Sequence, residues 1–229
     1  MLADAEPGPV VVSGDSAGGG LALIIAQGEP CLAGCMLVSP WLDLTADWSA
    51  DPELARRDVI LTPAWLEACV EAYAREADRA QPTISPLYGA LEGLPPLLIQ
   101  CGTDDLVAPD AERLAVRARA AGVDVTSTRW PRLWHNFPLQ PDLLAAADAA
   151  VTQSASFIAQ VCATTLSQPA ERQAPWRVDS RDARDEHAIA GIAAVSDGPA
   201  LSRERGPDGH DNASRGLPES RRAVGDHRA

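Results

Sequence analysis

The stretch VVVSGDSAGGG, residues 10–20, decides the fold of this chain. Its first part, Val10 to Ser13, is a short β-branched run that predicts a buried strand. A glycine-rich turn follows, and a helix is expected from about Ala17 to Gln27. A strand that passes into a helix through so tight a turn is typical of folds in which strands and helices alternate.

The chain repeats this alternation as far as residue 166. Further strands are expected at Cys35–Val38, Leu97–Cys101 and Asp124–Trp130. Further helices are expected from Pro63 through Tyr73 with Thr62 as the N-cap, from Pro109 to Ala121 with Gly122 closing the helix, and from about Pro141 to Val161. Alternation of this kind implies an α/β fold, in which a mostly parallel sheet carries helices on both faces.

The composition changes near Leu166, and this change predicts a domain boundary. Residues 1–166 are expected to form the folded domain. Residues 167–229 show little apolar periodicity and are rich in Gln, Pro, Arg, Asp, Gly and Ser. Such a segment cannot bury much apolar surface, so it is predicted to be disordered.

The bulk properties exclude several classes of partner. The formal net charge of −13 argues against nucleic acid or an anionic membrane surface as a partner. There is no apolar run long enough to span a bilayer, and the N-terminus, MLADAEPGP, has no feature of a secretory signal. The five cysteines fit neither a CxxC pair nor a metal-ligand set, which favours small buried residues in a reducing, cytoplasmic compartment.

The segment Gly14-Asp15-Ser16-Ala17-Gly18 has the G-x-S-x-G pattern and lies between a predicted strand and a predicted helix. That context is the one in which the pattern presents a nucleophilic serine on a strained turn. Gly14 and Gly18 are expected because side chains there would collide with the neighbouring strand and helix. The Ala17 N–H, at the helix N-terminus, is expected to stabilise an oxyanion.

A serine hydroxyl needs a base, and His135 is the single histidine before residue 166. It follows the fourth strand, and the base comes last in the order Ser, Asp, His. Asp104 and Asp105 follow the third strand, at the end of the sheet that carries the site in open α/β folds. Asp104 is preferred as the partner of His135, with Asp105 as the alternative. Asp110 is better explained as a first-turn charge that favours the helix dipole.

Three further residues are expected to bind the substrate. Asp15 lies beside the nucleophile, and Trp41 and Leu42 are candidates for an apolar wall, as is Trp65. Helix or core packing is the favoured alternative for each of the three apolar residues. No metal ligand is identified, and no metal or organic cofactor is implied.

Four motifs in order resemble those of the bacterial hormone-sensitive-lipase-like esterases. They are GDSAGG at 14–19, SPWLDLT at 39–45, SPLYGALEGLPPLLIQCGTDDLVAPDA at 85–111 and WPRLWHNF at 130–137. The resemblance covers roughly residues 5 to 160. It implies an α/β-hydrolase fold with a helical cap, here about residues 46–82, and hydrolysis of short-chain carboxylic esters. It also implies Ser16 as nucleophile, Asp104 as acid and His135 as base, and Asn136 stands where the family usually has an apolar or small residue.

One departure from the family is large. Its His-Gly-Gly-Gly motif, which supplies the other oxyanion donors, does not occur in this chain. The first half of the sheet, the oxyanion loop and the N-terminal cap helices are therefore expected to be missing. The main hypothesis is an ester hydrolase with a Ser-Asp-His triad and an acyl-enzyme. The alternatives are an inactive fragment and a small-molecule-binding relative without catalysis, and the oligomeric state stays open.

Overall fold

The computed structural model of this chain describes residues 8–167. In chain order the elements are β1 (Val11–Asp15), α1 (Ala17–Gly28), β2 (Gly34–Val38), α2 (Pro52–Arg57), α3 (Pro63–Ala74), the 3₁₀ turn η1 (Pro86–Tyr88), β3 (Leu97–Gly102), α4 (Ala108–Ala120), β4 (Val125–Trp130), the 3₁₀ turn η2 (Phe137–Leu139) and α5 (Ala145–Leu166). The disordered segment predicted for residues 167–229 lies, apart from its first residue, outside the described residues.

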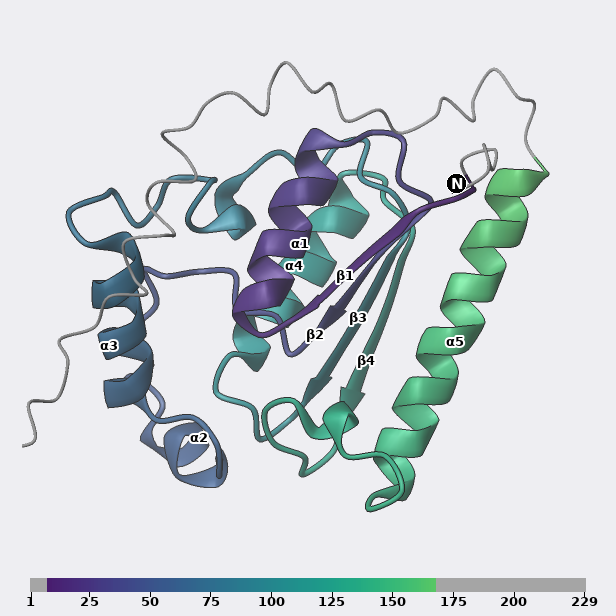
Figure 1. Ribbon diagram of the computed structural model, residues 1–229. Helices are drawn as coiled ribbons and strands as arrows, with labels where there is room; N and C mark the ends of the chain where they lie inside the picture. The colour runs from purple at the N-terminus through teal and green to yellow at the C-terminus, as the bar shows by residue number, and fades with distance from the viewer. Residues whose placement is uncertain (1–7, 168–229) are drawn as a thin grey trace, which may run out of the picture. The chain divides into compact units, whose positions relative to one another are not determined.

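The four strands form one parallel sheet in the order β1-β2-β3-β4. Helices α1 and α4 lie on one face of this sheet and α5 lies on the other (Figure 1). The α/β fold and the parallel sheet predicted from the sequence are confirmed. Because all four strands run the same way, the loops that follow them gather at one end of the sheet.

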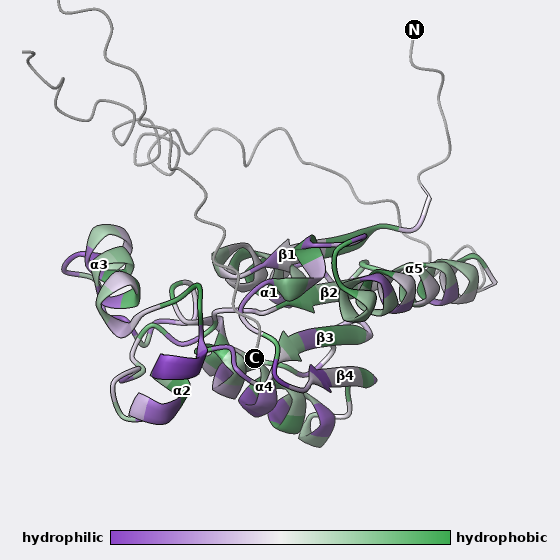
Figure 2. Ribbon diagram, turned by 90° about the horizontal axis from the view of Figure 1, so that it is seen from below, coloured by the Kyte–Doolittle hydropathy of each residue, from purple (hydrophilic) through white to green (hydrophobic). Residues whose placement is uncertain are grey.

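Alternate residues of each strand pack on opposite faces of the sheet, as the pleat of a β-strand requires. In β3, the side chains of Leu97, Ile99 and Cys101 join the large core cluster beneath α1 and α4. Leu98 instead packs against Phe157 and Val161 of α5. Strand β3 is therefore apolar on both faces, and Figure 2 shows β2 and β3 among the most hydrophobic parts of the ribbon.

Helices α2 and α3 form a separate insertion between β2 and β3. Their buried side chains, including Leu54, Leu66 and Val70, form a cluster of their own with Leu106 and Val107. Thr62 caps α3 by accepting a hydrogen bond from the Trp65 N–H, as predicted. This insertion falls within the range predicted for a helical cap.

Three local expectations were wrong. Helix α2 was not predicted, although Asp51 caps it and Pro52 opens it, the same signal that marks α3. Helix α5 begins at Ala145 rather than Pro141 because Asp142 has a positive φ of 68°. Of the cysteines predicted to be buried, Cys35 and Cys101 are, whereas Cys31 is exposed; all five are free thiols.

None of the helices in the described part of the chain is long and apolar enough to cross a lipid bilayer.

Candidate active site

Ser16 lies on a sharp turn between β1 and α1. Its backbone has φ 53° and ψ −124°, a strained conformation for a residue with a side chain. The strain is offset by hydrogen bonds on both sides of the residue. The Ser16 N–H donates to the Val38 carbonyl at 3.0 Å, and the Ser16 carbonyl accepts from the Trp41 N–H at 3.0 Å. The loop after β2 thus holds the turn that presents the Ser16 hydroxyl.

The glycines of this turn differ in how much space the surrounding atoms leave for a Cβ. A Cβ at Gly14 would lie 2.0 Å from the Gly18 carbonyl oxygen, so the predicted steric need is present at Gly14. The same prediction is wrong for Gly18, where a Cβ would meet nothing within 4 Å among the described residues. The crowded helix position is Gly19, where a Cβ would lie 2.9 Å from the Pro40 Cβ. The SPWLDLT loop therefore packs directly on the start of α1.

His135 reaches Ser16 from the loop that follows β4. Its Nε2 lies 2.9 Å from the Ser16 Oγ, and only 4% of the residue is exposed. The two residues come from the two outer strands of the described sheet, 119 positions apart in sequence. The structure thus brings together the predicted nucleophile and the predicted base.

The carboxylate that contacts His135 belongs to Asp105, and the preference for Asp104 is wrong in its geometry. The His135 Nδ1 lies 3.0 Å from the Asp105 Oδ1, and Asp105 is fully buried. Because a carboxylate can only accept, Nδ1 carries the proton and Nε2 is free to accept from the Ser16 hydroxyl. Asp104 instead accepts a hydrogen bond from Arg57 Nε at 3.1 Å.

The backbone around the two aspartates explains this outcome. The Asp104 N–H donates to the Leu133 carbonyl, which ties the backbone there to the loop that carries His135. The Asp105 Oδ1 also accepts from the Val107 N–H at 3.0 Å, at the beginning of α4. A carboxylate at a helix N-terminus is stabilised by the helix dipole. Asp104 and Asp105 thus hold different partners, Arg57 and His135.

Asn136, which follows His135, was not given a role from the sequence. Its side-chain Nδ2 donates to the Asp15 Oδ2 at 2.8 Å, and its backbone N–H donates to the Ser39 Oγ at 3.0 Å. The clue in the sequence was its position between His135 and Phe137, where the family usually has an apolar or small residue.

An apolar pocket of about 200 Å³ lies beside the nucleophile turn. It is lined by α1, α3 and the loop after β2, through Ala17, Gly20, Leu21, Ile24, Trp41, Leu44, Cys69, Tyr73 and Ile84. Trp41 thus lies on the wall for which it was a candidate. Leu42 does not line the pocket, because its side chain is fully buried in the core beneath α1, in agreement with the favoured alternative of core packing.

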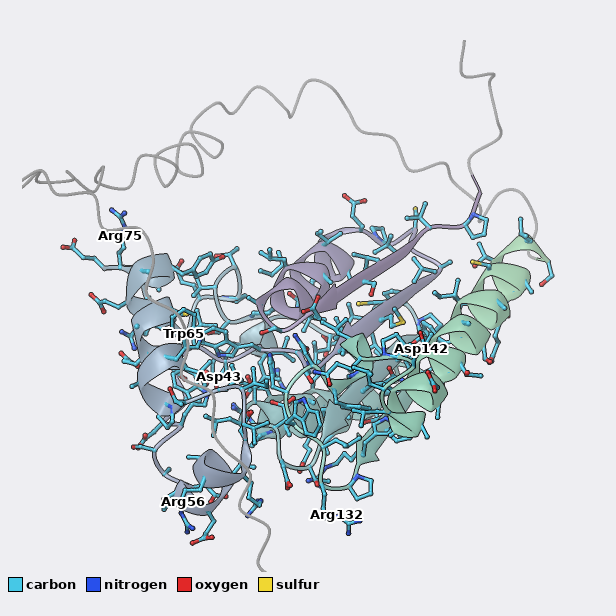
Figure 3. All side chains as sticks on the ribbon, turned by 60° about the horizontal axis from the view of Figure 1, so that its bottom comes forward. Asp43, Arg56, Trp65, Arg75, Arg132 and Asp142 are labelled. Carbon is cyan, nitrogen blue, oxygen red and sulfur yellow. The ribbon has the colours of Figure 1, made fainter. Side chains whose placement is uncertain are left out.

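The other two candidates lie away from this pocket. Asp15 contacts Asn136 and is not among the residues that line the pocket. Trp65 is 61% exposed on α3 and is labelled in Figure 3. Trp65 is therefore neither part of the pocket wall nor packed in the core.

Asp110 is more than a first-turn charge on α4. It is buried, and its Oδ2 accepts from the N–H groups of Leu42 and Asp43, at 2.8 and 2.9 Å. Burial raises the pKa of Asp110 to about 7, against the lowering effect of these two hydrogen bonds and of Arg113. Asp110 thus holds the SPWLDLT loop, which in turn supports Ser16.

Asp43, in the same loop, is the partner of Arg113. Its carboxylate accepts hydrogen bonds from Arg113, Tyr88 and Thr45. Burial opposes ionisation, but these hydrogen bonds outweigh it and lower the pKa of Asp43. Within residues 8–167, no group of three or more His, Cys, Asp or Glu side chains could hold a metal ion.

Comparison with known proteins agrees with this fold. A family model described as an alpha/beta hydrolase fold matches residues 2–139. The chain belongs to the α/β-hydrolase family. Among solved structures, this hydrolase-family chain is similar to the hormone-sensitive-lipase homologue EstE7 from a metagenome library, with a TM-score of 0.62, 37% identity, and coverage of 66% of this chain and 54% of that chain. A hormone-sensitive lipase, also from a metagenome library, gives a TM-score of 0.61 and 38% identity, over 66% of this chain and 53% of that chain.

Curated relatives point to the same branch of the α/β hydrolases. An acetyl-hydrolase of Streptomyces hygroscopicus is 39% identical over 134 residues, which are 56% of this chain and 45% of the relative. An esterase of Acinetobacter venetianus is 32% identical over 140 residues, which are 58% of this chain and 46% of the relative. The resemblance to bacterial hormone-sensitive-lipase-like esterases is confirmed. The chain spans about half the length of these curated relatives.

Proposed function

We propose that this chain carries the catalytic groups of a serine carboxylic-ester hydrolase that works through an acyl-enzyme. The observation that carries this proposal is the hydrogen-bonded row from Ser16 through His135 to Asp105, with distances of 2.9 and 3.0 Å. The names of the relatives, acetyl-hydrolase and esterase, support an ester as the substrate.

The reaction begins when the Ser16 Oγ attacks the ester carbonyl carbon and its proton passes to the His135 Nε2. Asp105 keeps the other ring proton on Nδ1 and stabilises the imidazolium that forms. The C–O bond to the alcohol then breaks, and Nε2 returns the proton to the leaving oxygen. Water then attacks the acyl-enzyme while the His135 Nε2 takes its proton. The bond to the Ser16 Oγ breaks, Nε2 returns the proton to that oxygen, and the acid is released.

The oxyanion formed at each step needs hydrogen-bond donors. The Ala17 N–H belongs to the first turn of α1, where N–H groups have no partner within the helix and the helix dipole favours negative charge. The other donors of the family come from the His-Gly-Gly-Gly motif, which this sequence lacks. Loss of one such donor typically lowers the rate by about 10²–10³-fold.

The apolar pocket next to Ala17 is the proposed site for the substrate's acyl chain. Its volume of about 200 Å³ favours a short chain, and Trp41, Cys69 and Tyr73 form part of its wall. A mostly apolar pocket with a few well-placed polar groups is the usual arrangement of a small-molecule site.

The test is covalent labelling with a fluorophosphonate probe, followed by peptide mass spectrometry. We expect the probe on Ser16, no labelling of Ser16→Ala, and labelling slowed by orders of magnitude in His135→Ala. Folding of each variant is checked by circular dichroism. Absence of labelling in the folded wild-type chain would sink the proposal and would favour a binding protein or an inactive fragment.

A further inference from the structure

The two loops that carry Ser16 and His135 are joined by a side-chain contact next to the reacting atoms. Asp15 directly precedes Ser16, and Asn136 directly follows His135. The Asn136 Nδ2 donates a hydrogen bond to the Asp15 Oδ2 at 2.8 Å. We call this pair the Asp15–Asn136 clasp.

Asn136 is anchored at two points that belong to different strands. Its backbone N–H donates to the Ser39 Oγ at 3.0 Å, directly after β2, and its side chain reaches Asp15 at the end of β1. Ser39 is itself fully buried, and its N–H donates to the Gln100 carbonyl of β3. The residue after His135 is therefore tied directly to the ends of β1 and β2, and through Ser39 to β3.

The choice of asparagine has an unfavourable consequence, which the clasp explains. Asn136 has φ 57° and ψ 27°, a left-handed conformation that glycine adopts without strain and asparagine tolerates. The Asp15 carboxylate only accepts, so it turns the Nδ2 toward itself and the Oδ1 away. That Oδ1 is buried and has no hydrogen-bond partner among the described residues. Glycine would avoid a buried unsatisfied oxygen, which lowers stability.

We propose that Asp15 and Asn136 are positioning residues that hold the His135 ring in line with the Ser16 Oγ. This inference rests on the proposed function and deepens it. Asp15 is exposed, and an exposed pair contributes little to stability. The Ser16 Oγ to His135 Nε2 distance of 2.9 Å, by contrast, tolerates little displacement. The clasp therefore acts on rate far more than on stability.

The test compares variants that break the clasp with one that rebuilds it in reverse. Asn136→Gly removes the side chain without backbone strain. Asn136→Asp keeps its size and tolerance of this backbone but sets two carboxylates against each other. Adding Asp15→Asn to Asn136→Asp restores an amide–carboxylate hydrogen bond with donor and acceptor exchanged. Asp15→Asn alone completes the double-mutant cycle, because it removes the charge but keeps a donor–acceptor pair.

The readouts are the fluorophosphonate labelling rate, kcat and KM for p-nitrophenyl acetate, and the thermal midpoint. We expect Asn136→Asp and Asn136→Gly to lower the labelling rate and kcat by about 10–100-fold with little change in KM, since a small misplacement of reacting groups has effects of this size. On a logarithmic scale, the double variant recovers at least half of the decrease in labelling rate and kcat that Asn136→Asp causes relative to the wild type. Labelling at the wild-type rate in both clasp-breaking variants, or no recovery in the double variant, overturns the inference.

Failure of the proposed function is distinguishable from failure of the clasp. If the wild type is not labelled, the function proposal falls, and the clasp is then read from the proton NMR signal of the hydrogen-bonded His135 Nδ1–H. Loss of that signal in Asn136→Asp and its return in the double variant support the clasp. An unchanged signal in Asn136→Asp overturns it.

Discussion

At the scale of single residues, the chemistry depends on which carboxylate contacts His135. Asp105 is buried against the ring and also accepts the Val107 N–H, whereas Asp104 is held by Arg57. Two adjacent residues thus have different partners and different exposure. The carboxylate that fixes the tautomer of His135 is the one whose loss should stop the reaction.

Replacing Asp105 by Asn should lower kcat by about 10⁴-fold, because an amide can impose the wrong tautomer on the imidazole. The matched control is Asp104→Asn, which removes the charge that pairs with Arg57 and should change kcat less than about threefold, as for a half-exposed ion pair. Steady-state hydrolysis of p-nitrophenyl acetate measures both. Equal losses in the two variants would contradict the assignment of Asp105.

The sequence located Ser16 and His135 because a patterned turn and a single candidate histidine leave little choice. It could not separate Asp104 from Asp105, since adjacent residues satisfy the same motif and their directions depend on how β3 ends. The pairing of Asp15 with Asn136 was equally hidden. It joins residues 121 positions apart, and no local pattern encodes that contact.

At the scale of elements, α3 and α1 together shape the apolar pocket, and Cys69 of α3 faces it. Replacing Cys69 by Trp should fill much of the pocket's volume. We expect kcat/KM for p-nitrophenyl octanoate to fall at least tenfold relative to the acetate. The control on the same helix is Trp65→Ala, outside the pocket lining, which should leave that ratio unchanged. If Cys69→Trp lowers kcat/KM equally for both esters, the acyl chain of the substrate does not bind in this pocket.

Asp110 of α4, which binds the loop after β2, makes the stability of the fold sensitive to pH. Burial raises its pKa from 3.8 to about 7, so in that interval the folded chain holds a proton that the unfolded chain releases. Stability therefore falls as the pH rises from about 4 to about 7. Asp110→Asn keeps an oxygen for the Leu42 and Asp43 N–H groups but does not titrate. Urea unfolding at pH 5, 6, 7 and 8 should show a flatter profile for this variant, and an identical profile would refute the effect.

Asp43 does not obscure that measurement. The hydrogen bonds from Thr45, Arg113 and Tyr88 lower its pKa, so it contributes stability that is lost only as the pH falls below the ordinary range of a carboxyl group. Its effect thus lies below the window in which Asp110 acts.

Most elements were predictable because a few residues mark their ends. Thr62 and Pro63 mark the start of α3, and Gly122, with φ 83°, follows α4. The start of α5 was not predictable, because Asp142 and Leu144 leave the helical conformation without any glycine or proline at those positions. Contacts with the rest of the fold decide such boundaries.

At the scale of the whole molecule, this chain contains the proposed nucleophile, base and acid but spans about half the length of the curated relatives it matches. The family's His-Gly-Gly-Gly motif is absent from its sequence. Reaction with a fluorophosphonate and repeated ester turnover place different demands on the oxyanion site. The two activities should therefore separate in this chain.

We expect Ser16 to be labelled while turnover of p-nitrophenyl acetate stays slow. A chimera that adds an upstream segment with the family's His-Gly-Gly-Gly motif should raise kcat by about 10²–10³-fold, the usual effect of one oxyanion donor. The control chimera carries alanines in place of the motif's glycines. If kcat is the same in this chain and in both chimeras, oxyanion donors do not limit the rate.

The proposed reacting groups lie after the two outer strands of the described sheet, Ser16 after β1 and His135 after β4, and this position has a consequence for experiments on folding. Any spreading or shearing of the intervening strands widens the gap between the hydroxyl and the imidazole. Reactivity of Ser16 therefore reports whether all four strands are in register. During refolding, the recovery of Ser16 labelling with time would therefore follow the assembly of the four-stranded sheet.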